Sequence, residues 1–366
     1  MRKRKLLLVA GARPNFMKVA PILRALRPSR RLKPLLVHTG QHYDFLMSEV
    51  FFRDLGIPEP DVYLGAGSGS HAVQTAQVLE KFEEVLKKEK PAAVVVVGDV
   101  NSTLAAALAA SKMGVPVAHV EAGLRSFDRA MPEETNRILT DRLSDFLFVT
   151  EDEGVRNLRR EGIGNEKIFH VGNVMIDALF MSRKKISRSL IRETLGVEKA
   201  RYAVATLHRP SNVDEEASFR GILETLGRVS ARCPVIYPLH PRARRSMERF
   251  GFFRRFEKAP GLKVIEPLGY ADFMNLVSGA AFVLTDSGGI QEETTVLGVP
   301  CLTLRENTER PATVRQGTNE LVGRDDRKIM RAVGRILAGR WKKGQSPRRW
   351  DGRAAVRIAR ILEKKI

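Results

Sequence analysis

The sequence predicts an α/β protein built from two doubly wound, parallel-sheet domains of the Rossmann-like kind. Short apolar runs alternate with longer stretches in which apolar residues recur at helical spacing, which is typical of parallel sheets covered by helices. This alternation starts again after Asn173. A chain of 366 residues is also too long for one typical core, so two domains are expected.

In the first half, the apolar runs predict buried strands and the stretches between them predict helices. Helices are expected at residues 73–90, at the Ala-rich residues 104–113, and at residues 133–143, which follow Pro132 in the favoured first helical position. The expected strands are residues 6–10, 35–39, 93–97, 115–120 and 146–150.

The second half repeats this pattern after a polar, basic stretch at residues 182–201. We expect an N-terminal domain of residues 1–172, a C-terminal domain of residues 173–351, and a final amphipathic helix, residues 352–366, that crosses back to the first domain. The expected strands are residues 202–207, 235–239, 262–265, 280–284 and 301–304.

The composition argues against several classes of protein. Arg and Lys are scattered and no nucleic-acid-reading motif accompanies them, so most of the net charge of +20 is expected to be solvated helix surface and a smaller share to serve an anionic substrate. No apolar run approaches the ~18 residues needed to cross a bilayer. Arg13 and Pro14 interrupt the N-terminal apolar run, which therefore predicts a strand rather than a signal peptide.

The two cysteines, Cys233 and Cys301, fit neither a metal spacing nor a disulfide framework. We therefore expect a cytoplasmic protein that binds no nucleic acid and does not insert into membranes. The glycine run at residues 65–69 lacks the third glycine of a dinucleotide fingerprint and follows a poor strand, so no nicotinamide site is expected. No cofactor and no metal are expected.

Residues 284–302 are the most informative stretch, because they predict a strand, a glycine-rich turn and a helix N-terminus in succession. The turn, Ser287-Gly288-Gly289, offers unpaired backbone N–H groups and is a ready anion site. Glu292 and Glu293 lie one turn into the helix, where they could hold the hydroxyls of a ribose. Together these features indicate a nucleotide-sugar site. The alternative is an ordinary turn with acids that suit the helix dipole.

Three acids in the first domain, Asp99, Glu121 and Glu133, follow successive elements of one predicted sheet. Ligands of doubly wound sheets bind at the carboxyl ends of the strands. Neighbouring carboxylates raise one another's proton affinity, so one can act as an acid while another acts as a base. The alternative for each of the three is a turn, cap or helix-dipole role.

Basic residues follow other predicted strands. Arg13 comes after the first strand and Lys18 lies on the helix that follows it. His208 ends the first strand of the second domain and is expected to face the first domain across a cleft. His240 repeats this position after the next strand and is a weaker candidate.

With these residues laid out, the chain resembles the non-hydrolysing UDP-N-acetylglucosamine 2-epimerases over nearly its whole length. The resemblance implies the GT-B architecture, the interconversion of UDP-GlcNAc and UDP-ManNAc without nicotinamide, and a homodimer. The motifs that carry it are GARPNFMKVAP (11–21), TGQHYD (39–44), VVGDVNST (96–103), HVEAGLRSFDRAMPEETNR (119–137), GNVMIDAL (172–179), LHRPSN (207–212), TDSGGIQEE (285–293) and ERP (309–311).

The resemblance also implies roles for the residues at matching positions. The catalytic residues become the acids Asp99, Glu121 and Glu133, with His208. Residues 41 and 42, Gln41 and His42, become candidate contacts for an activating second UDP-GlcNAc. The UDP contacts become Arg13, Ser287, Gly288, Gly289, Glu293 and Arg310, and Lys18, Arg137 and His240 fall near the sugar and phosphates.

Two departures from some family members bear on substrate detail: Asn15 stands where they carry Glu, and Pro210 where they carry Arg. The implied reaction eliminates UDP from C1 as a base removes the C2 proton, giving a 2-acetamidoglucal to which UDP re-adds. The ManNAc product would supply surface polysaccharide. The alternatives are a hydrolysing 2-epimerase, a 2-epimerase of a modified sugar such as a diacetamido uronic acid, a GT-B glycosyltransferase, and a non-catalytic nucleic-acid binder.

Overall fold

The chain was analysed as a computed structural model that describes residues 3–40, 56–67, 69–256 and 259–366. Internal contacts divide it into two compact units: Met1–Met181 with Arg348–Ile366, and Ser182–Pro347. The division falls inside helix α7 (Val174–Ser187) rather than before it at residue 172. The reason is that the first half of α7 is buried, including Val174, Ile176 and Leu179, and therefore packs as part of the first unit.

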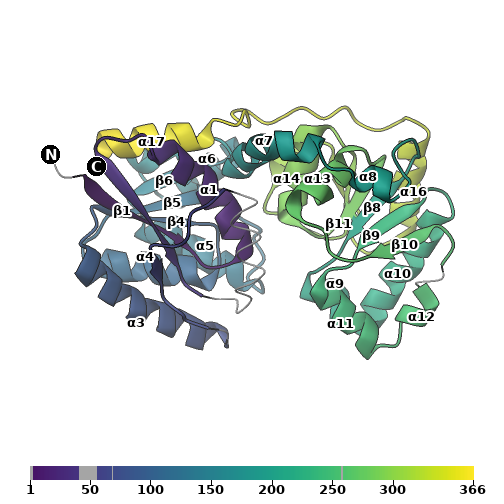
Figure 1. Cartoon of the computed structure of the whole chain (residues 1–366), viewed down its shortest axis with the longest axis horizontal. Helices are drawn as coiled ribbons and strands as arrows, with labels where there is room; N and C mark the ends of the chain where they lie inside the picture. Colours follow the sequence, from purple (N-terminus) through teal and green to yellow (C-terminus); the bar gives the residue numbers. More distant parts are fainter. Residues whose placement is uncertain (1–2, 41–55, 68, 257–258) are drawn as a thin grey trace. The chain divides into compact units, whose positions relative to one another are not determined.

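The described part of the first unit contains a seven-stranded sheet in the order β3-β2-β1-β4-β5-β6-β7, and all pairings between these strands are parallel. Helices cover both faces of this sheet (Figure 1). The strands are β1 (Arg4–Ala10), β2 (Leu32–His38), β3 (Val62–Tyr63), β4 (Ala93–Val97), β5 (Val117–Ala122), β6 (Phe146–Val149) and β7 (Ile168–His170). Besides α7, the helices are α1 (Arg13–Leu26), α3 (His71–Glu89), α4 (Asn101–Lys112), α5 (Pro132–Leu143), α6 (Asp152–Arg160), the short 3-10 turn η1 (Asn165–Lys167) and α17 (Ala354–Lys365).

The described part of the second unit is a six-stranded parallel sheet in the order β10-β9-β8-β11-β12-β13. Its strands are β8 (Ala203–Thr206), β9 (Val235–Pro238), β10 (Leu262–Ile265), β11 (Phe282–Thr285), β12 (Cys301–Thr303) and β13 (Asn319–Leu321). Its helices are α8 (Ile191–Thr194), α9 (Pro210–Val213), α10 (Glu216–Ser230), α11 (Pro241–Arg249), α12 (Phe253–Phe256), α13 (Tyr270–Ser278), α14 (Gly288–Leu297), α15 (Pro311–Arg315) and α16 (Asp326–Leu337).

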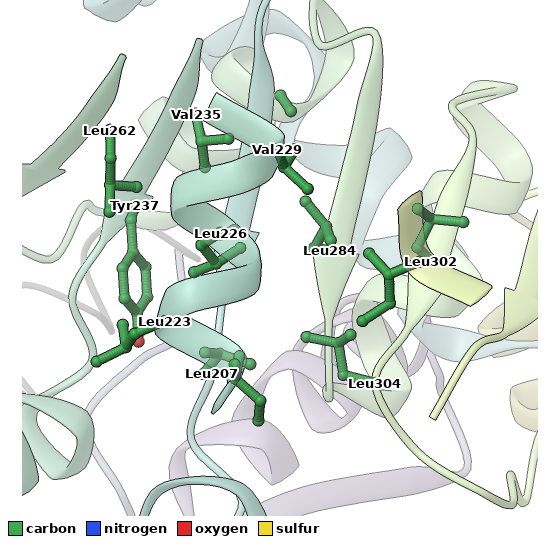
Figure 2. Close-up of a cluster of buried hydrophobic side chains, with 14 of the residues drawn as sticks. Leu207, Leu223, Leu226, Val229, Val235, Tyr237, Leu262, Leu284, Leu302 and Leu304 are labelled. Atoms are coloured by element: carbon green, nitrogen blue, oxygen red, sulfur yellow. The ribbon is translucent and has the colours of Figure 1, made fainter. Parts of the chain in front are cut away.

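The prediction of two parallel-sheet α/β domains is confirmed, and every strand expected from an apolar run is present. The central strands are largely apolar because a parallel sheet covered by helices is buried on both faces. All five residues of β4 are at most 1% exposed. In the second unit, α10 lays Leu223, Leu226 and Val229 against the strands, beside Tyr237 of β9 and Leu284 of β11 (Figure 2).

The final helix, α17, lies against α1 within the first unit (Figure 1). Its N-terminus is held by Asp177 of α7, whose carboxylate accepts hydrogen bonds from the backbone N–H groups of Ala354 (3.1 Å) and Ala355 (2.7 Å). These two donors would otherwise lack partners in the first turn of a helix. Of the helices described, none is both long and apolar enough to cross a membrane.

Each sheet has one place where the strand order reverses direction. In the first unit it lies between β1 and β4, and in the second between β8 and β11. Doubly wound sheets bind ligands beside such switch points, at the carboxyl ends of the strands. The residues that follow these four strands are therefore the first place to look for a site in either unit.

Candidate active site

In the first unit, Lys18 and Glu121 meet at the carboxyl edge of the sheet. Lys18 lies on α1 and Glu121 lies in β5, and the Lys18 Nζ is 2.6 Å from the Glu121 Oε2. Both side chains are almost fully buried. A desolvated, directly hydrogen-bonded pair of this kind is much stronger than a surface ion pair, and removing one partner leaves a buried charge uncompensated.

Gly98, which follows β4, lies beside the Lys18–Glu121 pair. Its φ is +68°, and a Cβ at this position would lie 2.8 Å from the Lys18 Nζ and 3.8 Å from the Glu121 Oε2. Both the backbone conformation and the crowding require glycine here. The ends of β4 and β5 and the second turn of α1 therefore converge on one point.

The backbone at Glu121 is in a strained conformation. Its φ is +74°, and the pairing of β5 with β6 shifts register between Val120 and Ala122. A β-bulge of this kind redirects a side chain, and a non-glycine residue in the left-handed region costs of order 1–3 kcal/mol. Such strain persists only where the surroundings enforce it, and it is common in functional sites.

Asn15, one of the two departures from some family members, has a structural role. Its side chain is buried, with Oδ1 accepting from the backbone N–H of Ala12 at 2.8 Å and Nδ2 donating to the Val97 carbonyl at 2.9 Å. Asn15 therefore ties the start of α1 to the end of β4. This tie contributes to the placement of Lys18, which lies one turn later on α1.

Asp99, directly after Gly98, is held by α5. The Arg137 guanidinium lies 2.7 Å from the Asp99 Oδ2, and the Asn136 Nδ2 donates to the Asp99 carbonyl at 2.9 Å. Arg137 is buried between two acids, because it also contacts Glu134 at 2.6 Å. About a quarter of the Asp99 side chain is exposed, so this carboxylate is accessible at the edge of the sheet.

The structure separates the roles of the two neighbouring glutamates at the start of α5. Glu134 is buried and accepts hydrogen bonds from the backbone N–H and hydroxyl of Ser126, so it organises the preceding loop. Glu133 is partly exposed in the first helical turn. The structure does not bring Glu133 into a hydrogen bond with Asp99 or Glu121. The backbone of Arg13 begins α1, whereas Gln41 and His42 lie outside the described residues.

In the second unit, His208 is anchored by Asp286, a residue that the sequence analysis did not single out. The His208 Nδ1 is 2.7 Å from the Asp286 Oδ1, and the backbone N–H groups of His208 and Arg209 also donate to this carboxylate, Arg209 at 2.9 Å. Asp286 is fully buried. Burial raises the pKa of Asp286, but the His208 hydrogen bond and charge together with the two backbone donors outweigh it and hold this pKa below its ordinary value.

The position of Asp286 in the sequence was a signal that it has a role. It follows β11 directly, and a charged side chain at the buried end of a strand needs partners. Because Asp286 is ionised and accepts from Nδ1–H, a neutral His208 ring keeps its Nε2 free to accept a proton. His240 is exposed at the start of α11, and its ring centroid is 5.5 Å from that of His208.

The turn after β11 is the N-terminus of α14, as the sequence predicted. Ser287, Gly288 and Gly289 are partly exposed there. A Cβ on Gly288 would lie 2.8 Å from the Glu309 Oε1, so a larger residue would push this carboxylate aside. A helix N-terminus with small, accessible residues suits a phosphate group, which accepts from the free N–H groups.

Glu292 and Glu293, the two acids of α14 that could hold the hydroxyls of a ribose, are both buried. Glu293 accepts a hydrogen bond from the Tyr270 hydroxyl at 2.6 Å, and burial raises the pKa of Glu293 to about 8. Glu292 is fully buried against Arg310, whose Nε lies 2.5 Å from the Glu292 Oε1. Arg310 therefore has a carboxylate partner beneath the turn. Among the described residues, no group of three or more His, Cys, Asp or Glu side chains is arranged so that it could hold a metal ion.

Comparisons with known proteins show which family the chain is similar to. A family described as UDP-N-acetylglucosamine 2-epimerase matches residues 24–363 of the chain. The UDP-N-acetylglucosamine 2-epimerase of Methanocaldococcus jannaschii is 43% identical over 363 residues, which cover 98% of this chain and 98% of that protein. The UDP-2,3-diacetamido-2,3-dideoxy-D-glucuronate 2-epimerase of Pseudomonas aeruginosa is also 43% identical, over 364 residues that cover 98% of this chain and 99% of the relative.

The solved structures give the same result at the level of the fold. The crystal structure of Methanocaldococcus jannaschii UDP-GlcNAc 2-epimerase in complex with UDP-GlcNAc and UDP superposes with a TM-score of 0.91 at 43% identity. The alignment covers 98% of this chain and 99% of that one.

Proposed function

We propose that this chain, which belongs to the UDP-N-acetylglucosamine 2-epimerase family, interconverts UDP-GlcNAc and UDP-ManNAc without releasing the sugar. Members of this family are isomerases, and this one is an isomerase by the same relationship. The observation that carries the proposal is the buried pair of Lys18 and Glu121 beside Gly98 and Asp99. It supplies carboxylates and a cation at the sheet edge where proton transfer is expected.

The carboxylates fit the proton transfers of the reaction. One of Asp99, Glu121 and Glu133 removes the C2 proton while the C1–O bond breaks, the electron pair of the C–H bond forms the C1=C2 bond, and UDP leaves with the C1–O electron pair. The resulting 2-acetamidoglucal is then protonated at C2 from the other face, and UDP re-adds at C1. The assignment of each acid to one face is part of what the variants below test.

The second unit fits the binding of the leaving group. The α14 N-terminus at residues 287–289 offers N–H groups to a phosphate, and developing negative charge on departing UDP is stabilised by donors that are already oriented. In the proposed assignment, Arg13 and Arg310 add positive charge, Glu293 lies by the ribose, and His208 with Asp286 completes the catalytic set. Lys18, Arg137 and His240 act near the sugar and phosphates.

Proton NMR of the purified protein with UDP-GlcNAc in D2O tests the proposal directly. UDP-ManNAc should grow to equilibrium with deuterium entering at C2. Glu121→Gln and Glu133→Gln should abolish this exchange while UDP still binds, and Arg13→Ala should weaken UDP binding as well. Glu89→Gln is the matched control, because Glu89 pairs with Lys5 at the end of α3. Wild-type turnover in Glu121→Gln would refute the acid-cluster mechanism.

A second candidate substrate is a UDP-diacetamido uronic acid. The Pseudomonas aeruginosa relative carries that activity in its name and is as similar to this chain as the Methanocaldococcus jannaschii enzyme, at 43% identity each. Running the same assay with both sugars decides between them by the ratio of kcat/KM values. Accumulation of free ManNAc and UDP would instead place the chain in the hydrolysing class.

The proposal has three further parts, and the first and third have their own tests. We propose a homodimer, which light scattering after gel filtration measures. A reducing, cytoplasmic location fits the two cysteines, which are both free and buried. A role in supplying ManNAc-containing surface polysaccharide predicts loss of that sugar from the polymer when the gene is deleted.

A further inference from the structure

A buried polar network lies directly beneath the Glu121 bulge. His119 of β5 and Asp141 of α5 are both about 1% exposed, and the His119 Nδ1 is 2.7 Å from the Asp141 Oδ1. Arg125 lies 2.7 Å from the Asp141 Oδ2 and forms a two-point contact with Glu161. None of these four residues has a role in the function proposed above.

Asp141 holds the chain on both sides of Glu121. Its Oδ1 contacts His119, two residues before Glu121, and its Oδ2 accepts from the backbone N–H of Gly123, two residues after, at 3.0 Å. The Gly123 carbonyl is fixed in turn by the Asn157 side chain at 2.9 Å. One buried carboxylate therefore spans the bulge in which Glu121 takes its positive φ.

His119 also contacts the end of the neighbouring strand, β4. Its Nε2 is 2.8 Å from the carbonyl oxygen of Gly98, the residue that packs against Lys18 and precedes Asp99. The backbone N–H of Gly98 donates to the Val120 carbonyl at 3.0 Å. The turn after β4 is thus bound to β5 through the His119 side chain and the Val120 carbonyl.

The two ring nitrogens of His119 have fixed partners. The Gly98 carbonyl oxygen can only accept, so the Nε2 atom must carry hydrogen. Burial raises the pKa of Asp141, but the His119 and Arg125 hydrogen bonds and charges outweigh it and keep this pKa below its ordinary value. The Nδ1 atom therefore faces a carboxylate that also contacts Arg125 and accepts from the Gly123 N–H.

We infer that His119 and Asp141 are positioning residues for the epimerase reaction: a buried imidazole–carboxylate pair that fixes Glu121 and the Gly98-Asp99 turn relative to each other. A purely structural role at this depth would be met as well by apolar side chains, which avoid the cost of burying charges. The buried polar contacts of the network instead hold the chain on both sides of Glu121 and hold the turn at Gly98. This inference rests on the function proposed above.

The two amide variants of His119 separate its two contacts. Asn places an N–H near the position of Nδ1 and keeps the Asp141 bond, whereas Gln places one near Nε2 and keeps the Gly98 bond. A displacement of about 1 Å in a reacting group costs on the order of 100-fold in rate. We expect His119→Ala and Asp141→Asn to lower kcat about 100-fold with little change in KM, and each amide variant to recover part of the loss.

The control for these variants is His71→Ala, because His71 contacts Asn101 from α3, outside the network, and has no proposed role. A His119→Ala protein that keeps wild-type kcat refutes the inference, as does a loss of kcat that neither amide variant reduces. If Asp141→Asn fails to fold, the three His119 variants still test the inference. Thermal melts followed by circular dichroism show whether each variant is folded.

A measurement on the substrate-free wild-type protein tests the inference independently of turnover. Two-dimensional 15N–1H NMR of the His119 ring should show hydrogen on Nε2, the atom that contacts the Gly98 carbonyl. A ring that carries hydrogen on Nδ1 alone refutes the inference. Inactivity of the wild type towards UDP-GlcNAc and towards the uronic acid analogue refutes the proposed function instead, so the two failures are distinguishable.

Discussion

Asp286→Asn is the substitution whose effects follow most directly from the structure. Asp286 is fully buried and accepts hydrogen bonds from the His208 ring at 2.7 Å, from the backbone N–H groups of His208 and Arg209, and from the Asn212 side chain at 3.1 Å. Asparagine has the same shape, but one of its two terminal groups donates. At least one of these bonds must therefore be lost.

The least costly arrangement reverses the bond to the His208 ring, because this ring can move its proton to Nε2 and accept from the new amide through Nδ1. A hydrogen bond to a charged group, worth about 1.5–3 kcal/mol, is then replaced by a neutral one, worth about 0.5–1.5 kcal/mol, so the free energy of unfolding should fall by about 1–2 kcal/mol. The proton on Nε2 also removes the accepting atom of His208. If His208 works as a general base, kcat should fall by about 10²–10⁴-fold.

Urea unfolding and the NMR turnover assay measure these two effects. Asp214→Asn is the matched control, because Asp214 forms a largely exposed pair with Arg242 in the same unit, and exposed pairs contribute only about 0–1 kcal/mol. A variant Asp286→Asn with wild-type unfolding free energy and wild-type kcat would show that the Asp286–His208 contact has neither role.

The pH dependence of the stability difference has a definite sign. The folded-state pKa of Asp286 is lowered, so its ionised form stabilises the fold above the unfolded-state pKa of about 3.9. This contribution is lost as the pH falls through the folded-state value. The difference in unfolding free energy between the wild type and Asp286→Asn should therefore stay constant from pH 7 down to about 4 and shrink only as the pH falls further.

Glu293→Gln should gain stability relative to the wild type as the pH rises. The pKa of Glu293 is about 8 in the folded protein and about 4.3 in the unfolded chain, so the wild type loses stability as the pH rises between these two values. Thermal melts at a pH below and a pH above this range measure the effect. Asp177→Ala, which removes the acceptor at the α17 N-terminus, should destabilise the first unit by about 1–2 kcal/mol, and α17 should become more sensitive to protease. Gly123→Ala places a Cβ 2.4 Å from the Gly154 carbonyl oxygen and should lower the melting temperature far more than Gly114→Ala, where the space is open and a positive φ alone costs about 1–2 kcal/mol.

Most of the fold was predictable because parallel strands that are buried on both faces have continuous apolar sequences. The strands that escaped prediction are β3, β7 and β13, which have two or three residues each and lie at sheet edges. Runs this short carry no periodicity that distinguishes them from loops. The boundary inside α7 was also hidden, because it depends on which neighbours bury each turn of one continuous helix.

The candidate site was predictable to the extent that it follows a rule about strand ends. Asp99, Glu121 and His208 were singled out in this way, since each ends an apolar run or follows one within two residues. Asp286 also follows a strand, but it lies beside a glycine-rich turn, and the anion site was predicted at Ser287 and Gly288 instead. The network of His119 and Asp141 gave no such signal, because its members come from the middle of a strand and the end of a helix.

The sequence alone determined the class of fold, the order of its elements and the residues at the strand ends, because apolar periodicity and turn chemistry are properties of neighbouring residues. The tertiary structure alone decided which charges meet: Lys18 with Glu121, Asp99 with Arg137, and His119 with Asp141. It also decided that Glu293 titrates near pH 8 while Asp286 stays ionised. Ion pairs and pKa values depend on distance and burial, and these exist only once distant parts of the chain have packed together.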